Sequence, residues 1–154
     1  MPKRYGGTEE EKLQIDAYVK MMRCADTVQN QLARNIEAYG ITLSQLGVLE
    51  ILLHHGAQNQ KSLAQKILRS GANMTTIIDN LEKRNLVNRS QDANDRRATV
   101  IELTVAGQKL ISELFPVHTR NIFRMMSVLT PEELRTYASL SRKLGLGSRE
   151  KMTL

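Results

Sequence analysis

The 154-residue sequence contains a single cysteine, Cys24, no tryptophan, two phenylalanines and four tyrosines. A single cysteine excludes an internal disulfide, so we expect a reducing compartment, the cytoplasm. Scarce aromatic residues argue against a single-strand nucleic-acid binder, because such proteins stack bases on aromatic side chains. We expect neither a signal peptide nor a membrane span, because the first residues have no apolar core and the apolar runs are too short to cross a bilayer. We therefore expect a soluble globular protein.

Motifs for catalysis and metal binding are missing as well. There is no glycine-rich phosphate loop, no Ser-His-Asp set and no suggestive pair of carboxylates. The histidines His54, His55 and His118 do not have the spacing of metal ligands. We therefore expect no enzyme, no metal and no cofactor.

Basic residues, in contrast, are in surplus. The chain has 22 Lys and Arg against 16 Asp and Glu, a net charge of +6. The excess lies in two blocks, residues 61–97 and 118–154, each with a net charge of +4. Such clustering suggests a polyanionic partner, with a solvated basic face as the alternative.

Apolar spacing predicts a long first helix over residues 8–40. Thr8 and Glu11 form a capping box at its start, and Gly40 can end it in a left-handed conformation. A helix of this length is unusual in a small domain and suggests a partner. A second, buried helix begins with another capping box, Thr42 and Gln45, and ends at Gly56.

Two short helices, about 60–68 and 71–84, follow with the turn Arg69-Ser70-Gly71 between them and Ser70 as the predicted N-cap. The second has an apolar inner face and a polar outer face, which describes a helix-turn-helix. Segments 86–90 and 99–103 are short and β-branched, and predict a hairpin with a basic loop.

Two more helices complete the pattern. Thr104 can cap a helix over about 105–127, and Thr130 with Glu133 opens a last helix that should stop at Gly145. We expect residues 1–7 and 147–154 to be flexible tails.

The run Leu81-Glu82-Lys83-Arg84-Asn85-Leu86-Val87, followed by Asp95-Arg96-Arg97 and a strand ending in Leu103-Thr104, resembles the signature of the MarR family of winged helix-turn-helix regulators. Asn85 replaces a frequent glycine, which it can do because Asn tolerates a left-handed helix stop. The resemblance covers about residues 12–145. It implies a mainly α fold with a β-hairpin wing, in which residues 41–104 bind DNA and the helices of 8–40 and 105–146 form a homodimer.

The resemblance also implies a transcriptional regulator, usually a repressor, that binds pseudo-palindromic double-stranded DNA. The recognition helix would offer Asn73, Thr75, Thr76 and Asn80 to the major groove, with Ser70 and the helix start holding a phosphate. In the wing, Arg97 would enter the minor groove, oriented by Asp95. Other basic residues are expected phosphate neighbours: Arg69, Arg89, Arg96, Lys61, Lys66 and Lys83. The alternative is that several of these are ordinary caps and surface residues.

The resemblance also suggests two ways in which the protein is regulated, by a small ligand or by oxidation. Family members often bind anionic or phenolic aromatic effectors, and the candidate lining here is Tyr18, Met22, Tyr39, His54 and His118, all of which could instead be core or interface residues. Cys24 could be a redox switch, with Lys20 and Arg23 nearby to lower its pKa, or a buried inert thiol. A DNA-architectural protein and a protein-interaction adaptor are alternative functions.

Overall fold

The computed structural model describes residues 6–67, 73–92, 95 and 98–151. The predicted site residues Arg69, Ser70, Arg96 and Arg97 lie outside these ranges. The chain forms two compact units, Met1–His118 and Thr119–Leu154, each of which is described by itself.

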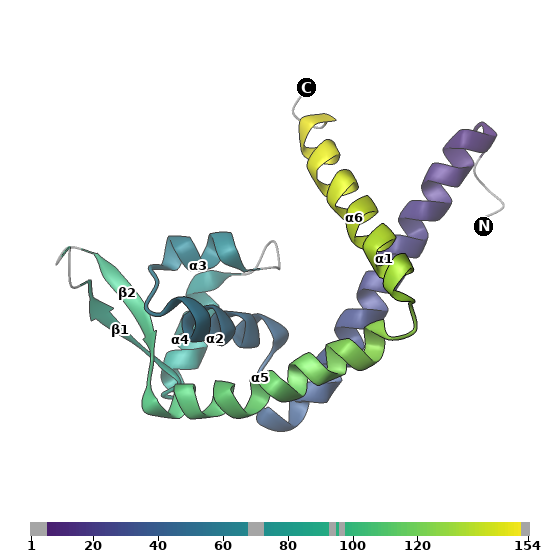
Figure 1. Ribbon diagram of the computed structural model, residues 1–154. Helices are drawn as coiled ribbons and strands as arrows, with labels where there is room; N and C mark the ends of the chain where they lie inside the picture. The colour runs from purple at the N-terminus through teal and green to yellow at the C-terminus, as the bar shows by residue number, and fades with distance from the viewer. Residues whose placement is uncertain (1–5, 68–72, 93–94, 96–97, 152–154) are drawn as a thin grey trace. The chain divides into compact units, whose positions relative to one another are not determined.

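The first unit holds several helices and a two-stranded hairpin, and the second unit is helical (Figure 1). This confirms the predicted mainly α, winged helix-turn-helix fold. The elements in chain order are α1 (Glu9–Ile36), the 3-10 turn η1 (Glu37–Tyr39), α2 (Leu43–His55), α3 (Gln60–Lys66), α4 (Met74–Lys83), β1 (Val87–Gln91), β2 (Thr99–Leu103), α5 (Val105–Met126) and α6 (Pro131–Lys151).

All three predicted capping boxes are present. The backbone N–H of Thr8 donates to the Glu11 carboxylate over 2.7 Å, and the Thr8 hydroxyl accepts from the Glu11 N–H. The same reciprocal pair occurs at Thr42 and Gln45. It recurs at Thr130 and Glu133, where these hydrogen bonds lower the pKa of Glu133. Each box satisfies backbone donors that a helix start would otherwise leave unpaired.

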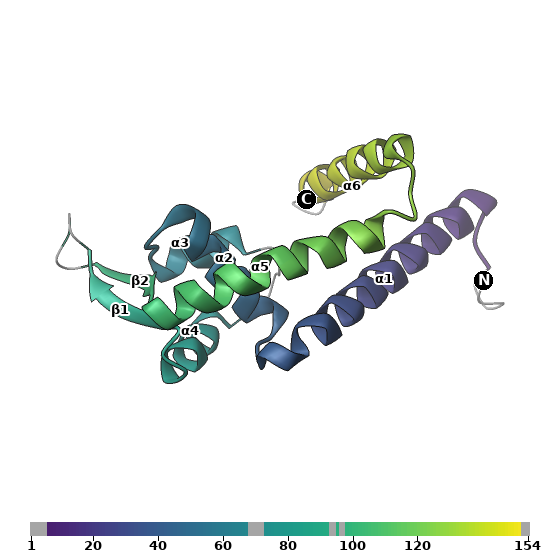
Figure 2. The same cartoon turned by 60° about the horizontal axis from the view of Figure 1, so that its bottom comes forward.

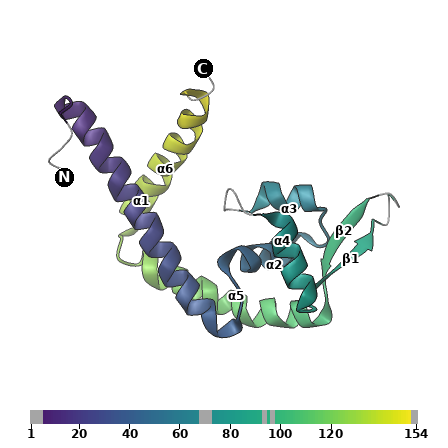
Figure 3. The same cartoon turned by 180° about the vertical axis from the view of Figure 1, so that it is seen from behind.

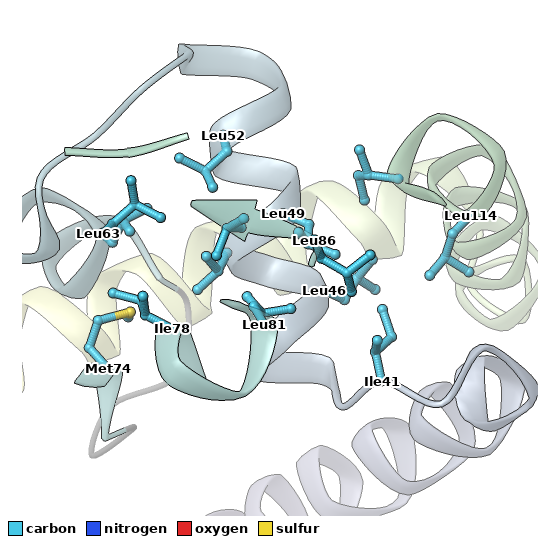
Figure 4. Packing of buried hydrophobic residues seen from close by; sticks show 14 of the residues in the cluster. Ile41, Leu46, Leu49, Leu52, Leu63, Met74, Ile78, Leu81, Leu86 and Leu114 are labelled. Carbon is cyan, nitrogen blue, oxygen red and sulfur yellow. The ribbon is translucent and has the colours of Figure 1, made fainter. Parts of the chain in front are cut away.

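The apolar core gathers around α2. Leu46 and Leu49 lie at its centre, with Ile78 and Leu81 from α4 and Leu114 from α5 packed in the same cluster (Figure 4). Full burial of each such side chain contributes about 1.5–3 kcal/mol. Helices α3 and α4 lie beside α2 and next to the hairpin, as the opposite views of Figures 1 and 3 show. The core thus fixes the helix-turn-helix against the wing.

Three predicted boundaries differ from the structure. Helix α1 ends at Ile36, although Gly40 does adopt the expected left-handed conformation after η1. Helix α4 begins at Met74 with Asn73 as its N-cap, so the prediction that Ser70 caps it is wrong. Helix α6 continues through Gly145 to Lys151, because glycine lowers helix stability without ending a helix unless it turns left-handed.

Among the described residues, no single helix is both long and apolar enough to span a membrane. One pair of helical segments in this part of the chain is long and apolar enough when taken together, Glu9–Tyr39 with Leu43–His55. The two segments are bent by 75° relative to each other. Burial of α2 in the core accounts for its apolar composition.

Candidate nucleic-acid interface

Helix α4 presents one apolar and one polar face. Met74, Ile78 and Leu81 are buried, while Thr75, Thr76 and Asn80 are exposed. The side chains of Thr76 and Asn80 have no partner among the described residues. These two groups are therefore available to a ligand outside the protein.

Two other predicted base-contacting residues already have structural roles. Asn73 Oδ1 accepts from the Thr76 N–H at 3.2 Å as the N-cap of α4, so only its Nδ2 is free of that contact. Gln60 Nε2 donates to the Thr75 hydroxyl at 2.7 Å, which joins the starts of α3 and α4. A bidentate adenine contact by Asn73 would compete with its capping bond.

Arg89 ties the wing to the recognition helix. Its side chain extends from β1 to α4. There Nη2 donates to Asp79 Oδ1 at 2.5 Å, and Nη1 donates to Glu82. The hydrogen bond with Asp79 is the largest of the effects that raise the pKa of Arg89 above its ordinary value. The guanidinium thus clamps β1 against α4, a role the sequence did not reveal.

The wing is an antiparallel hairpin in which Val87 faces Leu103 and Gln91 faces Thr99. Beyond the strands, the Asp92 N–H donates to the Ala98 carbonyl at 2.9 Å. Asp95 is exposed in this loop, and its carbonyl accepts from the Ala98 N–H. Asp95 therefore lies in the loop between the strands, while its neighbours Arg96 and Arg97, which the sequence predicts at the basic tip, lie outside the described residues.

The base of the wing is pinned to the start of α5 (Figure 2). Asn85 has φ 56°, the left-handed stop predicted from the sequence. The Thr104 hydroxyl donates to the Asn85 carbonyl at 2.6 Å and accepts from the Gly107 N–H at 3.0 Å. A Cβ on Gly107 would lie 1.9 Å from the Leu86 carbonyl oxygen, so this close approach requires glycine.

A cavity of about 410 Å³ opens beside α2 within the first unit. Its walls are mostly apolar, with several titratable groups, and comprise Gln29, Leu32, Leu43, Leu46, Gly47, Glu50, Ile51, His54, His55, Lys66, Ile67 and His118. Of the predicted effector residues, it brings together His54 and His118. Tyr18 and Met22 are exposed on α1, and Tyr39 packs against the core; none of the three lines this cavity.

The two cavity histidines differ in environment. His54 makes an edge-to-face contact with Phe115, with ring centroids 5.0 Å apart. His118 is buried, and its Nδ1 has no hydrogen-bond partner in the part of the chain that the structure describes. Burial lowers the pKa of His118, and the nearby Glu50 carboxylate offsets only part of that effect. The imidazole is therefore neutral near pH 7, with a polar atom available to a ligand.

Cys24 is exposed on α1, so the alternative of a buried thiol is wrong. Its neighbour on the preceding turn, Lys20, pairs with Asp16 at 2.6 Å.

These elements define a winged helix-turn-helix DNA-binding protein. Its recognition helix has a polar outer face, a short helix precedes it, and Arg89 holds the wing against it. The model of the MarR family matches residues 41–99. The transcriptional regulator PapX of Escherichia coli is 30% identical over 80% of this chain and 76% of its own. MhqR of Bacillus subtilis, another such regulator, is 29% identical over 88% of this chain and 94% of its own.

A solved structure agrees in fold. The S. aureus MepR–DNA complex superimposes with a TM-score of 0.71 and 26% identity, over 84% of this chain and 96% of MepR. The chain belongs to the MarR family, and it is a DNA-binding transcriptional regulator. Members of this family are regulators and not enzymes.

Proposed function

We propose that the protein is a homodimeric repressor that binds an inverted-repeat operator and is released by a small ligand. The observation that carries this proposal is the Arg89 clamp, which holds wing and recognition helix as one DNA-reading unit. Bound at a promoter in the cytoplasm, such a dimer would block transcription by occupying the DNA.

Exposed apolar side chains support the dimer. On α1, Leu13 is 66% exposed and Tyr18 59%; on α6, Leu140 is 59% exposed and Leu144 55%. A second copy of the chain would remove these side chains from water. We therefore assign residues 8–40 and 105–146 to the dimer interface and residues 41–104 to DNA binding.

On DNA, α4 would lie in the major groove, where Thr76 and Asn80 contact bases and Thr75 and the Asn73 amide contact bases or phosphates. Arg97, oriented by Asp95, would enter the minor groove. Phosphate contacts are assigned to Ser70, Arg69 and Arg96, whereas Arg89 acts through its ion pairs with Asp79 and Glu82. The half-sites of a two-fold dimer would lie about 34–36 Å apart.

Release would begin in the cavity beside α2. Its apolar walls suit an aromatic or similarly apolar effector, and the unpaired Nδ1 of His118 offers a hydrogen bond to orient it. His54 would pack against the effector. Tyr18, Met22 and Tyr39 belong instead to the dimer interface or core, and Cys24 on α1 is the proposed redox-sensitive thiol.

Arg97→Ala tests the DNA-binding proposal. We expect it to abolish specific binding, measured by fluorescence anisotropy on a duplex selected by the wild-type protein, and to leave the dimer folded. Arg149→Ala, which removes one positive charge from α6 outside the assigned dimer interface, serves as the control and should bind normally. Unchanged affinity of Arg97→Ala would contradict the assignment. Absence of DNA binding by the wild type would indicate an adaptor, and binding without sequence preference an architectural protein.

A further inference from the structure

Arg84 connects the end of the recognition helix to the end of the first helix. It is the C-cap of α4, and its side chain reaches the 3-10 turn η1 that follows α1. Nη1 donates to the Gly40 carbonyl at 2.5 Å, and Nη2 donates to the Tyr39 carbonyl at 3.2 Å. One side chain therefore joins two helix ends that lie 44 residues apart in the sequence.

The chemistry of this contact suits a guanidinium. The last carbonyls of a helix have no partner within the helix, and they carry a partial negative charge. The planar fork of an arginine can donate to two neighbouring oxygens at once in a fixed orientation. Among the described residues, Arg84 forms no ion pair with a carboxylate, so its two hydrogen bonds are both directed to this helix end.

The backbone that accepts these hydrogen bonds is itself held in place. Gly40 is left-handed with φ 66°, and its N–H donates to the Glu37 carbonyl at 2.9 Å. Ile36 and Ile41, on either side of η1, are buried in the apolar core. Arg84 is therefore attached to a fixed point of the fold and not to a loose connection.

The two ends of the contact have different tasks in the proposed dimer. Helix α1 belongs to the assigned dimer interface, whereas α4 is assigned to the major groove. The separation of the two recognition helices depends on how each α4 is held relative to the interface helices of its own chain. Inserting one base pair shifts a half-site by about 3.4 Å and rotates it by about one tenth of a turn, so a firmly held α4 matches one spacing only.

We propose that Arg84 is a positioning residue that sets the half-site spacing read by the dimer. This inference rests on the proposed function, since it assigns the spacing preference of that dimer to one side chain. Apolar burial holds α4 in the core without a preferred direction. Two charge-assisted hydrogen bonds from one planar group add the direction, and they fix the end of α4 relative to α1.

Arg84→Met tests this role, because it removes the fork and keeps an apolar stem. Lys83→Met is the matched control: it removes the neighbouring positive charge, and the Lys83 side chain is exposed and has no partner among the described residues. Affinity is measured for the duplex selected by the wild type and for two duplexes with one base pair inserted or deleted between the half-sites. The quantity compared is the ratio of the selected to the altered affinity.

We expect this ratio to fall about three- to tenfold in Arg84→Met, because a less firmly held α4 tolerates the altered spacings. Lys83→Met should keep the wild-type ratio, since losing a phosphate contact weakens binding to all three duplexes alike. Arg84→Lys keeps the charge without the fork, so its ratio should lie between those of wild type and Arg84→Met.

Two further measurements separate positioning from other effects. The Gly40 amide lies at the contact, and its hydrogen exchange should be faster in Arg84→Met than in wild type or Lys83→Met. Both variants should keep the dimer mass of the wild type by light scattering. A monomeric Arg84→Met would assign Arg84 to assembly and overturn the proposal.

The outcomes also separate this inference from the proposed function. Failure of the wild type to bind any duplex would contradict the proposed function. Specific wild-type binding with equal affinity for all three spacings would overturn the inference alone. An Arg84→Met protein with the wild-type ratio would overturn it too, and a salt slope reduced by about 0.9 in that protein would identify Arg84 as a phosphate contact.

Discussion

At Gly107 the start of α5 approaches the backbone of Leu86 too closely for any side chain. A Cβ there would lie 1.9 Å from the carbonyl oxygen and 2.8 Å from the carbonyl carbon of Leu86. Both are backbone atoms, so relief requires a shift of the wing base or of α5. We expect Gly107→Ala to lower the free energy of unfolding by about 2–3 kcal/mol in urea titrations.

Gly145→Ala is the matched control for this substitution. Gly145 lies inside α6, and a Cβ would meet nothing within 4 Å. Alanine there should raise stability by about 0.5–1 kcal/mol, because it reduces the entropy of the unfolded chain without strain. A Gly107→Ala protein as stable as wild type would show that the close approach to Leu86 does not constrain the fold.

Because His118 is buried, the free energy of unfolding depends on pH and decreases as the pH falls. Burial lowers the pKa of His118 below its unfolded value, so the unfolded chain takes up a proton first as the pH falls. Stability is therefore lost as the pH falls below about 6.5. We expect His118→Asn to lose less stability than wild type between about pH 7.5 and 5.5. Equal losses in urea titrations would contradict this account.

Among the elements, wing and recognition helix are joined by Arg89. Its ion pairs with Asp79 and Glu82 are partly exposed, so their loss should cost less than about 1 kcal/mol of stability. The functional cost should be larger, because β1 and α4 must hold a fixed position to read both grooves. We expect Arg89→Met to lower DNA affinity about tenfold with an unchanged salt slope, since Arg89 acts by positioning.

Lys83→Met provides the comparison, because Lys83 is exposed at the end of α4 and predicted to lie near a phosphate. It should reduce the slope of log affinity against log salt by about 0.9. The same reduction in Arg89→Met would show that Arg89 contacts a phosphate directly, in which case the clamp does not account for its effect.

The elements that the sequence predicts well are those set by neighbouring residues. The capping boxes at Thr8, Thr42 and Thr130 and the left-handed Asn85 depend on side chains within three or four positions. The start of α4 was harder to predict, because Ser and Asn are comparable N-caps. The structure has Asn73 as the cap, and Met74, the next residue, is buried.

Contacts distant in sequence could not be predicted. The partners of Arg89 lie on another element, and the glycine requirement at position 107 comes from a carbonyl at position 86. The bridge between Gln58 and Ile101 is likewise a product of the fold. These contacts arise only when α2, α4 and the hairpin share one core, and no local pattern marks them.

For the whole molecule, the proposal requires two chains. Leu13 and Leu140 are 66% and 59% exposed, and a glutamate at either position would place a charge in the assigned dimer interface. We expect Leu13→Glu and Leu140→Glu to give a monomer mass by light scattering at micromolar concentration, where wild type is a dimer. Asn80→Glu, at an exposed residue of α4 outside the assigned interface, should remain dimeric. A monomeric wild type would refute the dimer.

The central claim, a dimer that reads specific double-stranded DNA, is tested most directly by selection from a pool of random duplexes with the wild-type protein. The account predicts enrichment of an inverted repeat with half-site centres about 10 bp apart. The enriched duplex should bind two chains, at least about 1,000-fold more tightly than a shuffled duplex of the same composition. Absence of an enriched repeat, or equal affinity for the shuffled duplex, would contradict the claim.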